Sequence, residues 1–130
     1  MQDNTNAVVK AIVAAIQDKK GTDIVIADFR KLEDTVCKYF IICQGNTRPQ
    51  VEAIAHHVRE LTLEVTGEKP YAIAGEQVAQ WIAMDYGDIL VHIFQPQARA
   101  FYDLEHLWAD ACIERIPDID NQEPTDIQSL

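Results

Sequence analysis

The chain has 130 residues, a net charge of −10, 48% hydrophobic residues and 25% charged residues, which indicates one folded domain that can bury a core without disulfides or metal. The negative charge argues against non-specific binding to nucleic-acid phosphates; it suits a basic protein partner, or it serves only solubility. No apolar run is long enough to span a membrane and no signal peptide opens the chain, so we expect a cytoplasmic protein without sequence-specific nucleic-acid binding.

The first half of the sequence predicts a helix and two buried strands. Apolar residues recur at helical spacing from Ala7 to Lys20, and Gly21 follows as a natural stop. Two nearly continuous apolar runs then predict strands that are covered on both faces, at Asp23–Phe29 and Lys38–Gln44.

Local signals mark both ends of a second helix. Thr47 can cap its start, Gln50 three residues later can complete a capping box, and Gly67 can end it. A short strand is expected at Tyr71–Ile73. The helix before this strand is long enough to allow a parallel crossover in the sheet.

The second half predicts a hairpin and a last helix. Gln80–Asp85 and Asp88–Phe94 are the expected strands, joined by a tight turn in which Gly87 can take a positive φ. Pro96 then opens a helix whose packing stripe is expected to extend to Trp108.

Together these elements predict an α/β (α+β) fold, with one mixed sheet of about five strands and helices packed on it. The expected domain covers residues 1–116. The remaining residues, 117–130, are acidic and poor in apolar side chains, so we expect a disordered tail.

Aromatic residues are concentrated between Trp81 and Trp108, either to build the core or to present a surface. Alternation along the first hairpin strand places Trp81 on the same face as Asp85, opposite the aliphatic Ile82 and Met84. We therefore expect Trp81 to be half-exposed in an interface, where Trp and Tyr contribute most. The side chains expected in the core are Phe94, Phe101 and Leu107.

Each candidate catalytic group has a simpler structural explanation. Asp85 and Asp88 could hold a divalent cation, but Asp is a common turn residue, and no third carboxylate or phosphate-binding loop accompanies them. His92 lies mid-strand without a nucleophile motif, so we expect a half-buried imidazole bonded to backbone or to a carboxylate. Cys37 has only Lys38 beside it to lower its thiol pKa, which is poor support for a nucleophile.

Several segments resemble the ribosomal silencing factor (Iojap-like) family in their order and spacing. The similarity extends from Val8 to Trp108, leaves out the tail and is most specific from Trp81 onward. The segments that carry it are Asp23–Asp28, Tyr39–Thr47, Gly75-Glu76, Trp81-Ile82, Asp85–Phe94 and Phe101–Trp108.

The resemblance implies one α/β domain, related in fold to nucleotidyltransferases but in a family not known to act as one, without cofactor or metal. It implies binding to the large ribosomal subunit through that subunit's ribosomal protein fourteen. This contact would hinder joining of the small subunit and lower translation when nutrients are short; homodimers are also implied. The family's binding surface, carried over to this chain, comprises Trp81, Asp85, Tyr86, Asp88, Tyr102 and Leu104. Further candidates for the same surface are Met84, His92 and Arg99.

Two alternatives follow from the residues themselves. One is a magnesium-dependent enzyme of the nucleotidyltransferase type that uses Asp85 and Asp88. The other is a dimeric scaffold in which the aromatic residues serve self-association.

Overall fold

The computed structural model describes residues 5–30, 38–102 and 112–118, with the side chains of 101 and 102 left out. Within these residues the chain forms three helices and six strands. Their bounds are α1 (Thr5–Asp18), β1 (Thr22–Asp28), β2 (Tyr39–Gln44), α2 (Arg48–Thr66), β3 (Ala72–Ala74), β4 (Trp81–Asp85), β5 (Ile89–Phe94), α3 (Pro96–Tyr102) and β6 (Cys112–Ile116).

The six strands form a single mixed sheet in the order β3-β4-β5-β2-β1-β6. The two central strands, β2 and β5, are parallel, and every other neighbouring pair is antiparallel. The parallel pair needs a long connection, which α2 begins, while a tight turn joins β4 to β5. The predicted mixed sheet, its crossover and its hairpin are therefore confirmed.

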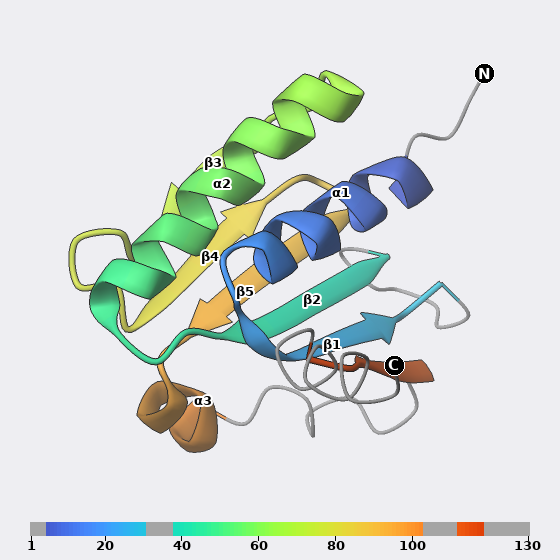
Figure 1. Cartoon of the computed structure of the whole chain (residues 1–130). Coiled ribbons are helices and arrows are strands. Elements are labelled where there is room, and N and C mark those ends of the chain that lie inside the picture. The colour runs from blue at the N-terminus through green and yellow to red at the C-terminus, as the bar shows by residue number, and fades with distance from the viewer. Residues whose placement is uncertain (1–4, 31–37, 103–111, 119–130) are drawn as a thin grey trace, which may run out of the picture.

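The helices divide the molecule into layers. α1 and α2 lie side by side across one face of the sheet, and α3 lies at the end of β5, away from these two (Figure 1). The main core fills the space between the two long helices and the sheet. A smaller core on the opposite face contains Phe29, Phe40 and Phe94, with Ala98 of α3 packed against it.

β1 and β2 are buried on both faces, as their nearly continuous apolar runs predict. Ile41 contributes to the main core and its neighbour Ile42 to the smaller one, because successive side chains of a strand point to opposite faces. Cys43 is buried in the same strand, and burial raises the pKa of its thiol to about 12, partly offset by the positive charge of Arg99. This cysteine is an inert core residue at neutral pH.

The start of α2 is held by the predicted cap and by one contact that the sequence did not predict. The Thr47 hydroxyl accepts a hydrogen bond from the Gln50 N–H at 3.2 Å, and Gly67 ends the helix with φ +78°. The Gln50 side-chain oxygen accepts from the N–H of Asn46, one residue before the cap, while its NH₂ group donates to the carbonyls of Lys19 and Lys20. Gln50 thus ties the start of α2 to the end of α1.

Gly21 does not stop the first helix in the expected way. The residue with left-handed backbone after α1 is Lys20, with φ +63°. Gly21 is needed for space instead, because a Cβ there would lie 2.4 Å from Cγ2 of Ile16.

The sixth strand, β6, was not predicted. It pairs antiparallel with β1 at the edge of the sheet and is exposed along most of its length. Its residues Cys112–Ile116 give little alternation, and only Ile116 packs against the main core. Just beyond it, the Asp118 carboxylate accepts a hydrogen bond from the N–H of Asp23.

Several predicted features lie outside the described residues. These are Cys37, the continuation of the last helix through Leu107 and Trp108, and most of the acidic tail. Phe94 is buried, as predicted, and the side chain of Phe101 is not described. No helix in the described parts of the chain has both the length and the hydropathy needed to cross a membrane.

Candidate docking face on the hairpin

The turn between β4 and β5 is built by local hydrogen bonds. The Asp85 carboxylate accepts from the N–H of Gly87 at 2.8 Å, and Gly87 has a φ of +87°. The N–H of Tyr86 donates to the carbonyl of Ile89 at 2.8 Å and closes the hairpin. Asp85 therefore acts as a turn residue, the simpler of its two predicted roles.

Asp88 connects the turn to the neighbouring strand and helix. Its backbone carbonyl accepts from the N–H groups of Lys38 and Tyr39, and its exposed carboxylate lies 3.7 Å from the Lys38 ammonium. The Thr5 hydroxyl, at the start of α1, lies 3.5 Å from the same carboxylate. Among the residues that the structure describes, no three His, Cys, Asp or Glu side chains converge as metal ligands. The contacts of Asp85 thus stabilise the turn, and those of Asp88 join the turn to β2 and α1.

Trp81 and His92 form a hydrogen-bonded pair on the face of the sheet opposite α1 and α2. The indole N–H of Trp81 donates to Nδ1 of His92 at 3.0 Å, across the β4–β5 ladder. Trp81 is half-buried, as predicted, whereas His92 is buried and bonded to a side chain that was not predicted as its partner. The pair fixes the indole in one orientation.

The environment of His92 keeps its imidazole neutral. Its ring lies against Phe40, Trp81 and Phe94, with centroid distances of 4.7, 5.7 and 6.2 Å, and burial lowers its pKa to about 4. Because Nδ1 accepts a hydrogen bond, the single proton of the neutral ring lies on Nε2, which has no partner among the described residues. His92 therefore holds the Trp81 indole by a hydrogen bond, and its buried ring is not available to accept a proton from a ligand at the surface.

Tyr86 is buried, which corrects its predicted place on an exposed surface of the hairpin. Its side chain is only 8% exposed and belongs to the main core. Its hydroxyl lies 2.8 Å from that of Thr62, which also donates to the carbonyl of Val58 in α2. Burial raises the pKa of Tyr86, against the opposing effects of the Thr62 hydrogen bond and the Arg59 charge. Tyr86 holds the turn under α2.

The other candidate residues divide between core and undescribed parts of the chain. Met84 is fully buried under α2, and Arg99 is buried with its guanidinium donating to the carbonyl of Asp23 at 2.6 Å. The side chain of Tyr102 and all of Leu104 are outside the described residues. Trp81, Asp85 and Asp88 are thus the predicted binding residues that the structure describes with accessible side chains.

One exposed aromatic residue next to the turn was missed. Tyr71 is 77% exposed, and its ring lies so close to Gly87 that a Cβ there would be 2.9 Å from its Cε2. Its N–H donates to the carbonyl of Asp85 and extends the pairing of β3 with β4. The sequence offered only its place at the end of a short predicted strand, which does not reveal exposure.

Comparison with known proteins places the whole chain in one family. The family model described as "Ribosomal silencing factor during starvation" matches residues 2–129. The ribosomal silencing factor of Bacillus subtilis is 37% identical over 108 residues, which is 83% of this chain and 90% of that protein. The chloroplastic Iojap protein of Zea mays is 33% identical over 110 residues, which is 82% of this chain and 46% of that protein.

Solved structures agree with this assignment. A crystal structure of a protein from Chromobacterium violaceum has a TM-score of 0.73 at 32% identity, with 79% of this chain and 84% of that chain covered. One from Bacillus halodurans has a TM-score of 0.69 at 34% identity, covering 79% of this chain and 94% of the other. The chain therefore belongs to the ribosomal silencing factor family.

Proposed function

We propose that this protein binds the large ribosomal subunit in the cytoplasm through ribosomal protein fourteen of that subunit. Docking there hinders joining of the small subunit and lowers translation when nutrients are short. The family membership supports this function, and the half-exposed Trp81 on the acidic hairpin is the structural observation that carries it.

Trp81 and Asp85 form the centre of the proposed docking face. They lie on the same side of β4, separated by the small Ala83, while Ile82 and Met84 are buried on the other side. The hydrogen bond to His92 holds the indole in place before binding, so less conformational entropy is lost in the complex. Aromatic residues near the centre of an interface contribute most of its binding energy.

Electrostatics support a basic partner. The chain carries a net charge of −10, and Asp88 adds an exposed carboxylate at the turn. A basic ribosomal protein would be attracted to such a surface, and like-charged surfaces would be repelled. We also propose that silencing is steric and needs no catalysis, because the Asp85 carboxylate already accepts the Gly87 N–H and the Asp88 carboxylate already lies 3.7 Å from the Lys38 ammonium. We propose homodimer formation separately, because two copies of the chain could associate through a surface other than the hairpin.

Co-sedimentation with isolated large ribosomal subunits tests the docking face. We expect Trp81→Ala to weaken binding about thirtyfold or more, because removing a central Trp typically costs about 2 kcal/mol or more. Asp85→Asn keeps an acceptor for the Gly87 N–H and removes only the charge, so we expect a smaller loss. Val65→Ser, which changes an exposed apolar side chain at the end of α2, is the control and should bind like wild type.

Each variant is first compared with wild type by circular dichroism and thermal unfolding, so that loss of the fold is separated from loss of the contact. Trp81→Phe keeps most of the ring area and should retain more binding than Trp81→Ala. The placement of the face is wrong if Trp81→Ala and Asp85→Asn pellet with the subunit as wild type does. The function itself is wrong if the wild-type protein does not pellet with the subunit.

A further inference from the structure

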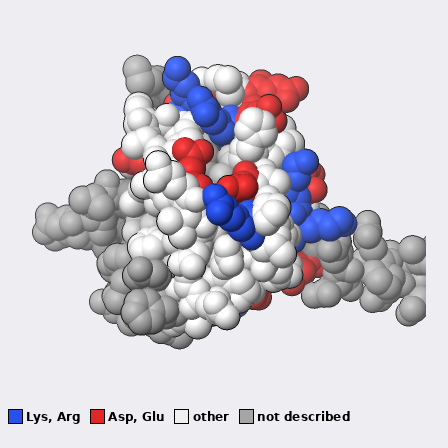
Figure 2. Space-filling model, turned by 90° about the vertical axis from the view of Figure 1, so that its left-hand side faces the viewer, with Lys and Arg blue, Asp and Glu red and all other residues white. Residues whose placement is uncertain are grey.

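We infer that a second site, between α2 and β3, binds a free amino acid with an apolar side chain. The site is a cavity of about 190 Å³ lined by Glu52, Ala55, His56, Arg59, Ile73, Glu76 and Ile82. It lies on the opposite face of the sheet from the Trp81–His92 pair. Figure 2 shows the side of the molecule where α2 begins, with acidic and basic side chains around a hollow.

The cavity has an apolar floor. Ala55 and Ile82 are buried, whereas Ile73 of the edge strand β3 is half-buried. The volume of this cavity lies below the roughly 300–1,000 Å³ of pockets for drug-sized ligands, and it suits a smaller ligand such as a single amino acid. An apolar side chain over Ile73 would remove this floor from water.

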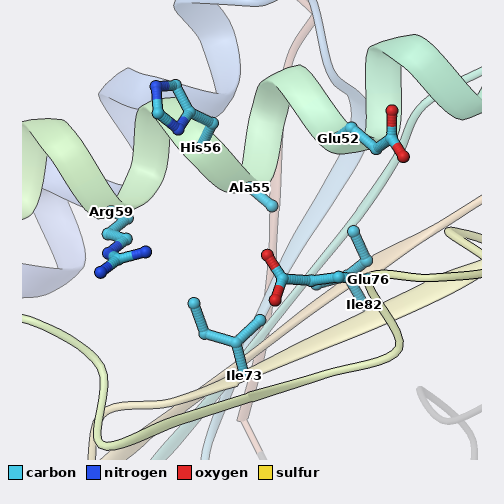
Figure 3. Close-up of a pocket in the computed structure, with 7 residues that line it drawn as sticks. All are labelled: Glu52, Ala55, His56, Arg59, Ile73, Glu76 and Ile82. Carbon is cyan, nitrogen blue, oxygen red and sulfur yellow. The ribbon is translucent and has the colours of Figure 1, made fainter.

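Two opposite charges face the cavity without pairing to each other. The guanidinium of Arg59 and the carboxylate of Glu76 point toward the same gap above Ile73, from α2 and from the loop after β3 (Figure 3). Neither side chain forms an ion pair within the described parts of the chain, although each lies at the rim of the same cavity. The gap therefore presents one positive and one negative side chain to a ligand.

The two other polar residues of the rim already have partners. Glu52 is paired with Arg48 at 3.3 Å, and His56 with Glu60 at 3.1 Å. Figure 3 shows the Glu52 carboxylate and the His56 ring directed away from the gap. The charges that a ligand meets are thus those of Arg59 and Glu76.

The wall that carries Glu76 is fixed to the helix. The Arg48 guanidinium donates to the carbonyl of Gln77 at 2.6 Å, which ties the loop to the start of α2. Gly75 has a φ of +89° and lies so close to β4 that a Cβ would be 2.1 Å from the carbonyl oxygen of Trp81. The loop that carries Glu76 is therefore anchored both to α2 and to β4.

A zwitterion with an apolar side chain fits this arrangement. Its carboxylate would accept hydrogen bonds from the Arg59 guanidinium, its ammonium would pair with the Glu76 carboxylate, and its side chain would cover Ile73 and Ile82. Because both charges lie at an exposed rim, each ion pair contributes little, and we expect a dissociation constant of about 1 mM.

The test is a titration of the ¹⁵N-labelled full chain with L-leucine, followed by amide chemical shifts. We expect saturable shifts at Ala55, Ile73 and Glu76, with leucine raised to about 20 mM to approach saturation. N-acetyl-leucine lacks the ammonium and leucinamide lacks the carboxylate, so each should bind more weakly, by a factor of up to about five. Glu76→Gln and Arg59→Gln should weaken leucine binding by a similar factor.

Glu114→Gln and Arg115→Gln are the matched controls. They remove the same charges from exposed positions on β6, at the opposite edge of the sheet, and should bind leucine like wild type. Absence of saturable shifts overturns the inference, as does equal binding of leucine by the wild type and the two cavity variants. Equal binding of leucinamide and leucine would show a site for cations, and this too would overturn the amino-acid assignment.

Discussion

His92 makes the stability of this fold depend on pH. Burial lowers its pKa from 6.5 to about 4. Above pH 6.5 the imidazole is neutral in both the folded and the unfolded chain, so it adds no pH dependence. As the pH falls from 6.5 toward 4, only the unfolded chain takes up the proton, and the free energy of unfolding should fall by about 3 kcal/mol in total.

Urea unfolding of wild type and of His92→Gln across this pH range measures the effect. Gln does not titrate and can still accept from the Trp81 indole, while all other titrating groups are common to the two proteins. The difference in unfolding free energy between them should therefore shift against the wild type as the pH falls. Parallel pH profiles would show that His92 takes up its proton equally well in the folded chain.

On the hairpin, the alternation of side chains along β4 correctly predicts which of them are buried and which are half-exposed. Trp81 is half-exposed as the pattern indicates, because it shares a face with Asp85. The same alternation places Tyr86 with Ile82 and Met84, on the buried face, so its expected exposure contradicted the pattern. The partner of Tyr86 is Thr62, 24 residues away in the chain, and no local signal identifies such a contact.

Of the three described glycines with positive φ, Gly67 and Gly75 differ most clearly in the space around them. At Gly67, after the end of α2, a Cβ would have no neighbouring atom within 4 Å, whereas a Cβ at Gly75 would be blocked by the backbone of β4. We expect Gly67→Ala to lower the free energy of unfolding by about 1 kcal/mol, through backbone strain alone. Gly75→Ala should lower it by about 3 kcal/mol or more, because β4 must also move.

Chemical denaturation of the two variants gives this comparison directly. Both substitutions add one methyl group at a left-handed position, so each is the control for the other. Equal losses would mean that the loop after β3 shifts freely, and the cavity wall that carries Glu76 would then not be anchored. A larger loss for Gly75→Ala supports the anchored wall.

At the scale of elements, regular patterns and caps were predictable and edge structure was not. The caps at Thr47 and Gly67 are properties of neighbouring residues, and both are confirmed. β6 is an exposed strand that depends on pairing with β1, close to the other end of the chain, so its own sequence carries little signal. The cavity between α2 and β3 was not predicted either, because Arg59 and Glu76 are distant in the sequence and line the same cavity only in the folded chain.

At the scale of the whole molecule, the two faces of the sheet carry different proposed roles. The face opposite α1 and α2 presents Trp81, supported by His92, and the helical face carries the cavity beside Ile73. β4 contributes to both, through Trp81 on one side and Ile82 on the other. A ligand in the cavity and a partner at the proposed docking face would therefore contact opposite sides of the same strand.

The net charge of −10 predicts how salt affects association with the large subunit, if the proposed function holds. Attraction to a basic partner speeds encounter and is screened by salt, so the association rate constant should fall as ionic strength rises from about 0.05 to about 0.3 M. Asp88→Asn removes a charge at the proposed face and should reduce this dependence, whereas Glu114→Gln, on the far edge strand, should change it less.

Trp81→Ala should instead raise the dissociation rate constant, because the indole contact forms after encounter. Stopped-flow or biosensor measurements with purified subunits separate the two rate constants. A salt-independent association rate would contradict electrostatic attraction, and equal slopes for Asp88→Asn and Glu114→Gln would place the charged contact away from the hairpin.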